Sequence, residues 1–238
     1  MRRALIVYVV LIHAVAALVL WKSDFIDRVE KQLSPMAPAD EISHHHKLML
    51  AFHLRTDELV PDRAVAFVGD SLIQGLHTDA VASPSVNYGI AGDTTVGVLA
   101  RVPVYRSLRR AAVIVMAVGV NDIKFRANDE IVLNYRRILQ TLEPSVPLVM
   151  AAVLPVDESV LPSQIASNDR IRDLNVSLSA LCRARARCLF ADAGAKLVDA
   201  RGNLSAVLHD WDGLHLNNAG NRIWAEVLQT AIKTAQSM

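Results

Sequence analysis

The feature that most constrains the fold is the alternation, from residue 64 onward, of short apolar runs with segments of helical periodicity. The runs are apolar at nearly every position, which is typical of strands that are buried on both faces. Strands of this kind that alternate with helices form a parallel sheet covered by helices, so we expect an α/β domain. The expected strands are Ala64–Val68, Val86–Tyr88, Ala112–Val118, Pro147–Leu154 and Arg187–Ala191, and the expected helices are one from Leu72, Thr94–Val102, Asp129–Leu142, Pro162–Arg183 and one from Asn217.

Composition adds two limits. A chain of 238 residues that is 52% hydrophobic can bury a large core. Its formal net charge is +1 with acidic and basic residues intermixed, so we expect no nucleic-acid partner. The sequence contains no Gly-x-Gly-x-x-Gly or Walker pattern, which leaves a dinucleotide-binding or phosphate-binding domain without support.

The N-terminus carries an apolar stretch that nearly matches the thickness of a bilayer core. Ala4–Trp21 holds eighteen uncharged residues, and Arg2 and Arg3 precede it. We favour an uncleaved membrane anchor over residues 1–22, because a signal peptide has a shorter apolar region that a small-residue cleavage site follows closely. A cleaved signal, which would give a secreted protein, is the alternative. The two arginines favour a cytoplasmic N-terminus and a domain on the extracytoplasmic side, which is periplasmic in a Gram-negative cell.

Residues 23–61 have a helical, membrane-proximal pattern that breaks at Pro35 and Pro38, with a second helix expected over Ile42–Leu59. His44, His45 and His46 are consecutive in this segment. Adjacent helical residues point in different directions, so three in a row cannot converge on one ion, and we expect no metal site. The catalytic domain is then expected over residues 62–238.

Two cysteines, Cys182 and Cys188, lie six residues apart near an expected helix end. They can form a disulfide only if the intervening turn brings their Cα atoms to about 4.4 to 6.8 Å. We expect two buried thiols, and a disulfide is the alternative.

Polar residues cluster just beyond the expected strands. Gly69-Asp70-Ser71 follows the first strand, Gly89 to Thr94 the second and Gly119-Val120-Asn121-Asp122 the third, while Asp212-Gly213-Leu214-His215 precedes the last helix. In a parallel sheet, ligands bind beyond the carboxyl ends of the strands, where these segments are expected to meet. They supply a hydroxyl, an imidazole, a carboxylate, a carboxamide and glycine-flanked backbone donors, which is the set of groups that acyl transfer requires.

Each group has a physical role in that chemistry. Ser71 needs a base to take its proton, and His215 is the best-placed histidine. Asp212, three residues earlier, can orient the imidazole and stabilise the imidazolium that forms. We expect the oxyanion hole to consist of the backbone N–H groups of Ser71 and Gly92 and the side-chain amide of Asn121.

These four blocks resemble those of the SGNH, or GDSL, hydrolase family. Gly69-Asp70-Ser71-Leu72, Gly89 with Gly92-Asp93-Thr94, Gly119-Val120-Asn121-Asp122 and Asp212-Gly213-Leu214-His215 stand in the family's order, and the resemblance covers Ala64 to about Leu228. It implies a flavodoxin-like three-layer α/β/α fold, hydrolysis of esters or thioesters without metal or other cofactor, and the roles just assigned. All four residues that give the family its name are present: Ser71, Gly92, Asn121 and His215.

Several single residues also allow other interpretations. Ser71 alone suits a helix cap, and Asp70, Asp93 and Asp122 are expected to be caps and loop braces rather than catalytic acids. His209 with Asp210 is the rival to the His215 pair but lacks the three-residue spacing. We expect His77 at the surface, and Trp211 either in packing or in contact with an acyl group.

The sequence therefore predicts a membrane-anchored serine esterase or lipase-like acyl hydrolase that acts on a small-molecule, lipid or glycan ester. One alternative is acetyl transfer to, or acetyl removal from, a cell-envelope polysaccharide. An alternative of another class is an anchored module that binds acylated ligands without turnover. The patterns leave open the acyl-chain length, ester against thioester, and the oligomeric state, because these depend on pocket walls and surfaces.

Overall fold

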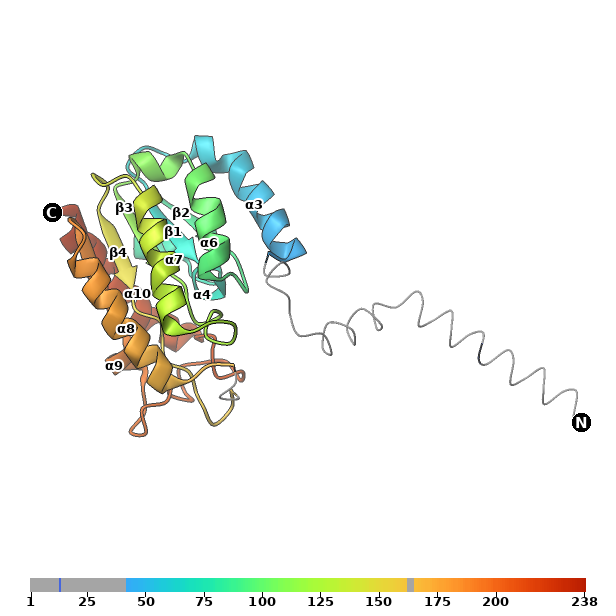
Figure 1. Cartoon of the computed structure of the whole chain (residues 1–238). Coiled ribbons are helices and arrows are strands. Elements are labelled where there is room, and N and C mark those ends of the chain that lie inside the picture. Colours follow the sequence, from blue (N-terminus) through green and yellow to red (C-terminus); the bar gives the residue numbers. More distant parts are fainter. Residues whose placement is uncertain (1–12, 14–41, 162–164) are drawn as a thin grey trace, which may run out of the picture. The chain divides into compact units, whose positions relative to one another are not determined.

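The computed structural model describes His13 and residues 42–161 and 165–238, and Ile42–Met238 form one compact unit (Figure 1). The predicted anchor over residues 1–22 and the segment 23–41 lie outside the described residues, His13 excepted. Within the described ranges, none of the helices combines the length and apolar character needed to cross a membrane.

The core of the unit is a five-stranded sheet in the order β2-β1-β3-β4-β5, in which every neighbouring pair is parallel. This is the flavodoxin-like strand order, and it confirms the predicted α/β fold with a central parallel sheet. Residues of β1, β3 and β4 are buried at every position, as the apolar runs indicated. The strands are Val65–Gly69 (β1), Ser85–Gly89 (β2), Val113–Ala117 (β3), Leu148–Ala151 (β4) and Cys188–Ala191 (β5).

Helices cover both faces of the sheet and divide the core into two clusters (Figure 1). Ala66 and Val68 of β1 pack toward α6, α7 and α8, while Val65 and Phe67 pack toward α4, α5, α9 and α10. The helices are α3 (His44–Thr56), α4 (Ser71–Gln74), α5 (Thr78–Val81), α6 (Thr95–Arg101), α7 (Asn128–Thr141), α8 (Asn168–Arg183), α9 (Gly194–Leu197) and α10 (Asn218–Gln236). Short 3-10 turns are Asp57–Leu59, Val102–Val104 and Ser107–Arg110.

One helix begins later than predicted. The sequence pattern starts a helix at Pro162, whereas α8 starts at Asn168. The Asn168 side chain fixes this start, because it accepts from the Val156 N–H (2.9 Å) and donates to the Val156 carbonyl (2.8 Å). The Glu158 carboxylate accepts from the Asn168 N–H (2.6 Å), so the Glu158 side chain also lies at the N-terminal end of the helix.

The prediction of two buried thiols is wrong, because Cys182 and Cys188 form a disulfide. Their Cα atoms lie 5.3 Å apart, within the range that a disulfide needs. The approach results from the tight turn between α8 and β5, in which Arg187 adopts a positive φ of 57°. The disulfide therefore ties the last turn of α8 to the edge strand of the sheet.

Candidate active site

The end of β1 places Ser71 at the carboxyl edge of the sheet. Asp70 caps α4, since its Oδ1 accepts from the Leu72 N–H at 3.0 Å, and Ser71 is the first residue of the helix. The preceding Gly69 is required by close packing, because a Cβ there would lie 2.1 Å from the Ala117 carbonyl oxygen of β3. The cap interpretation of Asp70 is therefore confirmed.

Ser71, His215 and Asp212 form a continuous hydrogen-bonded chain. Ser71 Oγ lies 2.9 Å from His215 Nε2, and His215 Nδ1 lies 2.5 Å from Asp212 Oδ2. A carboxylate only accepts, so Nδ1 carries the proton and Nε2 is free to accept from the Ser71 hydroxyl. This is the arrangement that a nucleophile, a base and an orienting carboxylate require.

Asp212 is held by its own loop. Its Oδ1 accepts from the backbone N–H groups of Leu214 and His215, both at 3.0 Å, and Gly213 turns the chain with a φ of +74°. Burial alone would raise the pKa of Asp212, but the hydrogen bonds from the His215 side chain and from these two N–H groups hold the pKa below its ordinary value of 3.8. Asp212 is therefore a carboxylate at neutral pH.

Of the three predicted oxyanion donors, the Ser71 N–H lies at the start of α4, and Gly92 and Asn121 lie in the loops that follow β2 and β3. Gly92 has a φ of +75°, which favours glycine, although a Cβ there would meet none of the described atoms within 4 Å. Asn121 Nδ2 donates to the Asp93 carbonyl at 3.0 Å and so joins the two loops. An amide nitrogen carries two hydrogens, so this contact leaves a second N–H for a ligand.

The aspartates of these loops act as braces, as predicted. Asp122 Oδ2 accepts from the Thr95 N–H (2.9 Å), its Oδ1 accepts from the Thr95 hydroxyl (2.5 Å), and Arg126 also binds the carboxylate. Burial raises the pKa of Asp122 to about 6 despite these bonds, and burial with the charges of Asp93 and Asp122 raises the pKa of Asp70 to about 7. Ser71 thus directly follows a carboxyl whose pKa is raised to about 7.

Sequence reasoning missed Arg101, which is 0% exposed. Its guanidinium donates to Asp93 Oδ2 (2.8 Å), to the Gly69 carbonyl (2.9 Å) and to the Tyr105 hydroxyl (3.2 Å). It thereby connects the end of β1 to the loop that holds Gly92. A glycine inside the same helix, Gly97, was the available signal of a close approach.

The rival residues lie in other places. His209 Nε2 lies 3.2 Å from Asp157 Oδ2, and its Nδ1 contacts the Asp210 carbonyl, so it ties the loop before α10 to the loop after β4. His77 is exposed, as expected. Trp211 is 91% exposed, so the packing interpretation of Trp211 is wrong.

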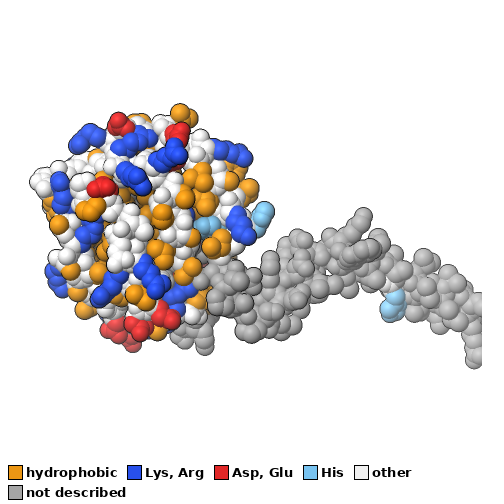
Figure 2. Space-filling model, turned by 45° about the horizontal axis from the view of Figure 1, so that its top comes forward, with side chains coloured by type: hydrophobic (Ala, Val, Ile, Leu, Met, Phe, Trp, Pro, Cys, Tyr) orange, Lys and Arg blue, Asp and Glu red, His pale blue; other side chains and the backbone are white. Residues whose placement is uncertain are grey.

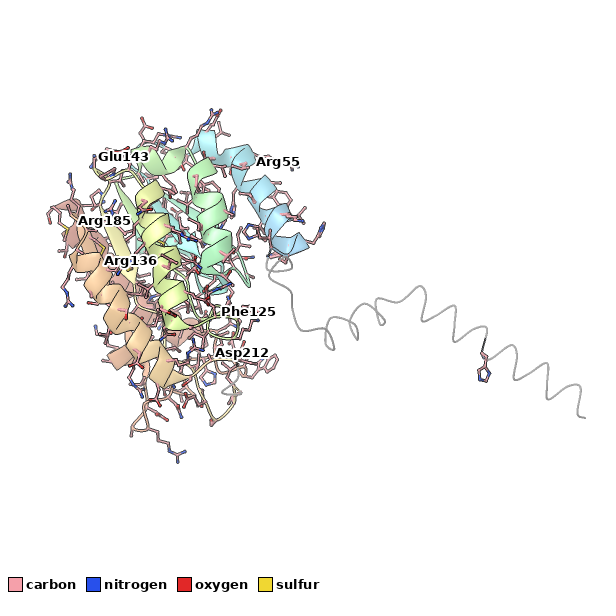
Figure 3. All side chains as sticks on the ribbon, viewed as in Figure 1. Arg55, Phe125, Arg136, Glu143, Arg185 and Asp212 are labelled. Atoms are coloured by element: carbon pink, nitrogen blue, oxygen red, sulfur yellow. A yellow bond between two sulfur atoms is a disulfide. The ribbon has the colours of Figure 1, made fainter. Side chains whose placement is uncertain are left out.

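The site lies at one end of the domain. Figure 3 shows Phe125, in the loop after β3, and Asp212, in the loop before α10, at the end of the domain opposite Glu143. On the face in Figure 2, Lys and Arg side chains are scattered among hydrophobic ones, in keeping with the net charge of +1.

The sequence matches the model of the GDSL-like lipase/acylhydrolase family over residues 61–223, which is more than half of the chain. The chain belongs to this family. It is therefore an ester-hydrolysing enzyme, as the sequence predicted. No curated protein sequence matches the chain significantly.

Solved structures share the fold. A structure from Streptococcus pneumonia that carries the name platelet activating factor has 25% identity and a TM-score of 0.73, over 79% of this chain and 92% of its own. A GDSL-like lipase from Bacteroides thetaiotaomicron has 18% identity and a TM-score of 0.64, over 78% and 98%. An acetylxylan esterase from Geobacillus stearothermophilus has 17% identity and a TM-score of 0.59, over 71% and 94%.

Proposed function

We propose that this enzyme is a serine hydrolase that cleaves carboxylic or thio esters through an acyl-Ser71 intermediate. The observation that carries the proposal is the chain of contacts from Ser71 Oγ to His215 (2.9 Å) and from His215 to Asp212 (2.5 Å). A binding module does not require a base aligned on a hydroxyl in this way.

In the first half-reaction, Ser71 Oγ attacks the carbonyl carbon of the ester while His215 Nε2 takes the hydroxyl proton. The negative charge that develops on the carbonyl oxygen is stabilised by the N–H groups of Ser71 and Gly92 and by the Asn121 amide. Asp212 stabilises the imidazolium. The tetrahedral intermediate then collapses, and the leaving alcohol or thiol receives its proton from His215.

In the second half-reaction, water attacks the acyl carbon of the acyl-Ser71 ester. His215 Nε2 accepts a proton from that water, and the same oxyanion donors stabilise the second tetrahedral intermediate. Its collapse releases the carboxylic acid and returns the proton to Ser71 Oγ. Over the cycle, one ester and one water are converted to an acid and an alcohol or thiol, and Ser71, His215 and Asp212 return to their starting states.

Ser71→Ala tests the proposal directly. The wild-type chain should react with a fluorophosphonate probe and hydrolyse p-nitrophenyl acetate, and the variant should do neither. Ser145→Ala, which removes an exposed hydroxyl beside Glu143 at the far end of the domain, should behave as the wild type. A Ser71→Ala chain that still labels and cleaves at the wild-type rate would refute the nucleophile assignment.

We propose further that residues 1–22 anchor the enzyme in the membrane and that its domain lies on the extracytoplasmic side. The apolar stretch Ala4–Trp21 behind Arg2 and Arg3 supports this placement. The Cys182–Cys188 disulfide is in keeping with an oxidising compartment. A reporter fused after Met238 that is active only in the cytoplasm would contradict it.

A second candidate substrate is an O-acetyl group on a cell-envelope polysaccharide, either removed or transferred. The structural similarity to an acetylxylan esterase favours this candidate. The catalytic mutants of that enzyme replace a serine, an aspartate and a histidine, with the aspartate three positions before the histidine. Esters of graded acyl length and an acetylated glycan, compared on the same preparation, distinguish the two: high activity on acetyl groups with little on long chains supports the glycan.

A further inference from the structure

Helix α3 precedes the stretch that matches the family, yet it contacts the loop that carries Gly92. His46 and His53 lie seven residues apart on one face of α3, and both are buried, whereas His44 and His45 are exposed. His46 Nδ1 lies 3.2 Å from Asp93 Oδ1, and His53 Nδ1 lies 2.9 Å from the Tyr105 hydroxyl. The buried face of the helix therefore presents two imidazoles to the interior.

Asp93 is the centre of a buried network. Its Oδ1 accepts from the Thr94 N–H (3.0 Å) and from His46, its Oδ2 accepts from Arg101 (2.8 Å), and its carbonyl accepts from Asn121 (3.0 Å). Asp93 is 2% exposed, so each of these donors replaces water that the carboxylate cannot reach. Asp93, the residue directly after Gly92, is thereby held at both carboxylate oxygens and at its carbonyl oxygen.

Gly97 makes room for this arrangement. A Cβ at Gly97 would lie 1.8 Å from Asp93 Oδ1 and 3.0 Å from His46 Cε1, so the carboxylate and the imidazole occupy the space that a side chain would fill. The end of α3 is fixed as well, because Asp57 Oδ1 accepts from the Tyr88 and Ser107 hydroxyls, both at 2.6 Å. α3 is thus attached through His46 to the loop that carries Gly92. Through Asp57, which directly follows the helix, it is also attached to Tyr88 of the edge strand β2.

We propose that His46 is a positioning residue for the oxyanion hole: it holds the Asp93 carboxylate and, through Asp93, the Gly92 backbone and the Asn121 amide. The inference rests on the proposed serine-hydrolase function. Oxyanion donors act only when they are fixed in advance, and small displacements from a distant residue reduce rates strongly. Loss of the His46 contact therefore lowers kcat, while the ground-state affinity for the ester changes little.

Two variants of equal size test the contact. His46→Asn keeps a donor near the position of Nδ1, and His46→Leu has the same shape without a donor. In the full chain with p-nitrophenyl acetate, we expect His46→Leu to lower kcat by about 10- to 100-fold with KM within about threefold, and His46→Asn to recover most of the loss. The exposed His45→Ala on the same helix is the control and should match the wild type.

A second measurement does not depend on catalysis. Hydrogen–deuterium exchange of the backbone from Gly89 to Thr95 should be faster in His46→Leu than in His46→Asn or in the wild type. The inference is overturned if both variants match the wild type in kcat and in exchange. It is also overturned if His46→Leu and His46→Asn lose kcat to the same extent. If His46→Leu does not fold, His46→Ala replaces it in the same comparison.

The failure of the two proposals can be told apart. A wild-type chain that hydrolyses none of the esters and does not label with a fluorophosphonate contradicts the serine-hydrolase function. A wild-type chain that is active, with His46→Leu equally active, contradicts only the role of His46.

Discussion

The buried Asp70 carboxyl allows a quantitative test of how the site affects stability. Burial and the charges of Asp93 and Asp122 raise its pKa from the ordinary 3.8 to about 7 in the folded chain. A folded-state pKa above the unfolded value means that the folded chain binds the proton more tightly, so this contribution to stability is complete below pH 3.8 and is lost as pH rises through about 7. At roughly 1.4 kcal/mol per pH unit, the loss amounts to about 4 kcal/mol.

Asp70→Asn removes the charge and keeps an oxygen that can accept from the Leu72 N–H, since Asn and Asp cap helices about equally well. The free energy of unfolding of the variant should equal that of the wild type near pH 4 and exceed it by about 4 kcal/mol near pH 9. Urea unfolding of both chains at several pH values measures this difference. Titrating groups that do not interact with Asp70 contribute equally to both chains and cancel.

The control is Asp173→Asn, which removes one negative charge from an exposed position on α8. The reasoning is refuted if the difference between Asp70→Asn and the wild type does not change from pH 4 to pH 9, or if it favours the wild type at high pH.

Three further outcomes are expected. Asp212→Asn should lower kcat/KM by roughly three to four orders of magnitude, because Asn can stabilise the wrong tautomer of His215; a loss below tenfold in ester assays would contradict the orienting role. Asn121→Ala should lower kcat by about 100- to 1,000-fold at similar KM, and unchanged steady-state kinetics would remove it from the oxyanion hole. Replacing both Cys182 and Cys188 with Ser should reduce the free energy of unfolding by about 2 kcal/mol, measured by urea unfolding, with catalysis unchanged; equal stability would show that the disulfide constrains little.

The apolar runs predicted the strands well because a strand that is buried on both faces has little choice of residues. All five runs became strands, with ends that differ from the predicted ones by at most three residues. Their order across the sheet does not follow from the runs, since Val113–Ala117 and Leu148–Ala151 look alike as sequences while occupying different places. The fold class was therefore predictable from pattern, and the disposition of strands came with the resemblance.

The residues of the site also fall into those that the sequence predicted and those that it did not. Ser71, Asp212 and His215 were predicted because their chemistry is uncommon in combination, and the structure brings their side chains into one hydrogen-bonded chain. Arg101 and His46 were missed, because a charged or polar residue in a helical pattern usually indicates the solvent-facing side. His46 is buried against Asp93, 47 positions away, and Arg101 is buried against Gly69, 32 positions away, so neither contact is visible in the local pattern.

Ser71 and His215 are 144 positions apart, and α10 follows directly after the loop of His215. A chain that is being synthesised therefore contains the proposed nucleophile long before it contains the proposed base. If the proposed mechanism holds, no ribosome-bound nascent chain can hydrolyse an ester until residue 215 has emerged and its loop has docked. The appearance of activity then reports the contact between Ser71 and His215, which is one of the longest-range contacts in the described domain. Activity therefore marks the completion of folding rather than its start.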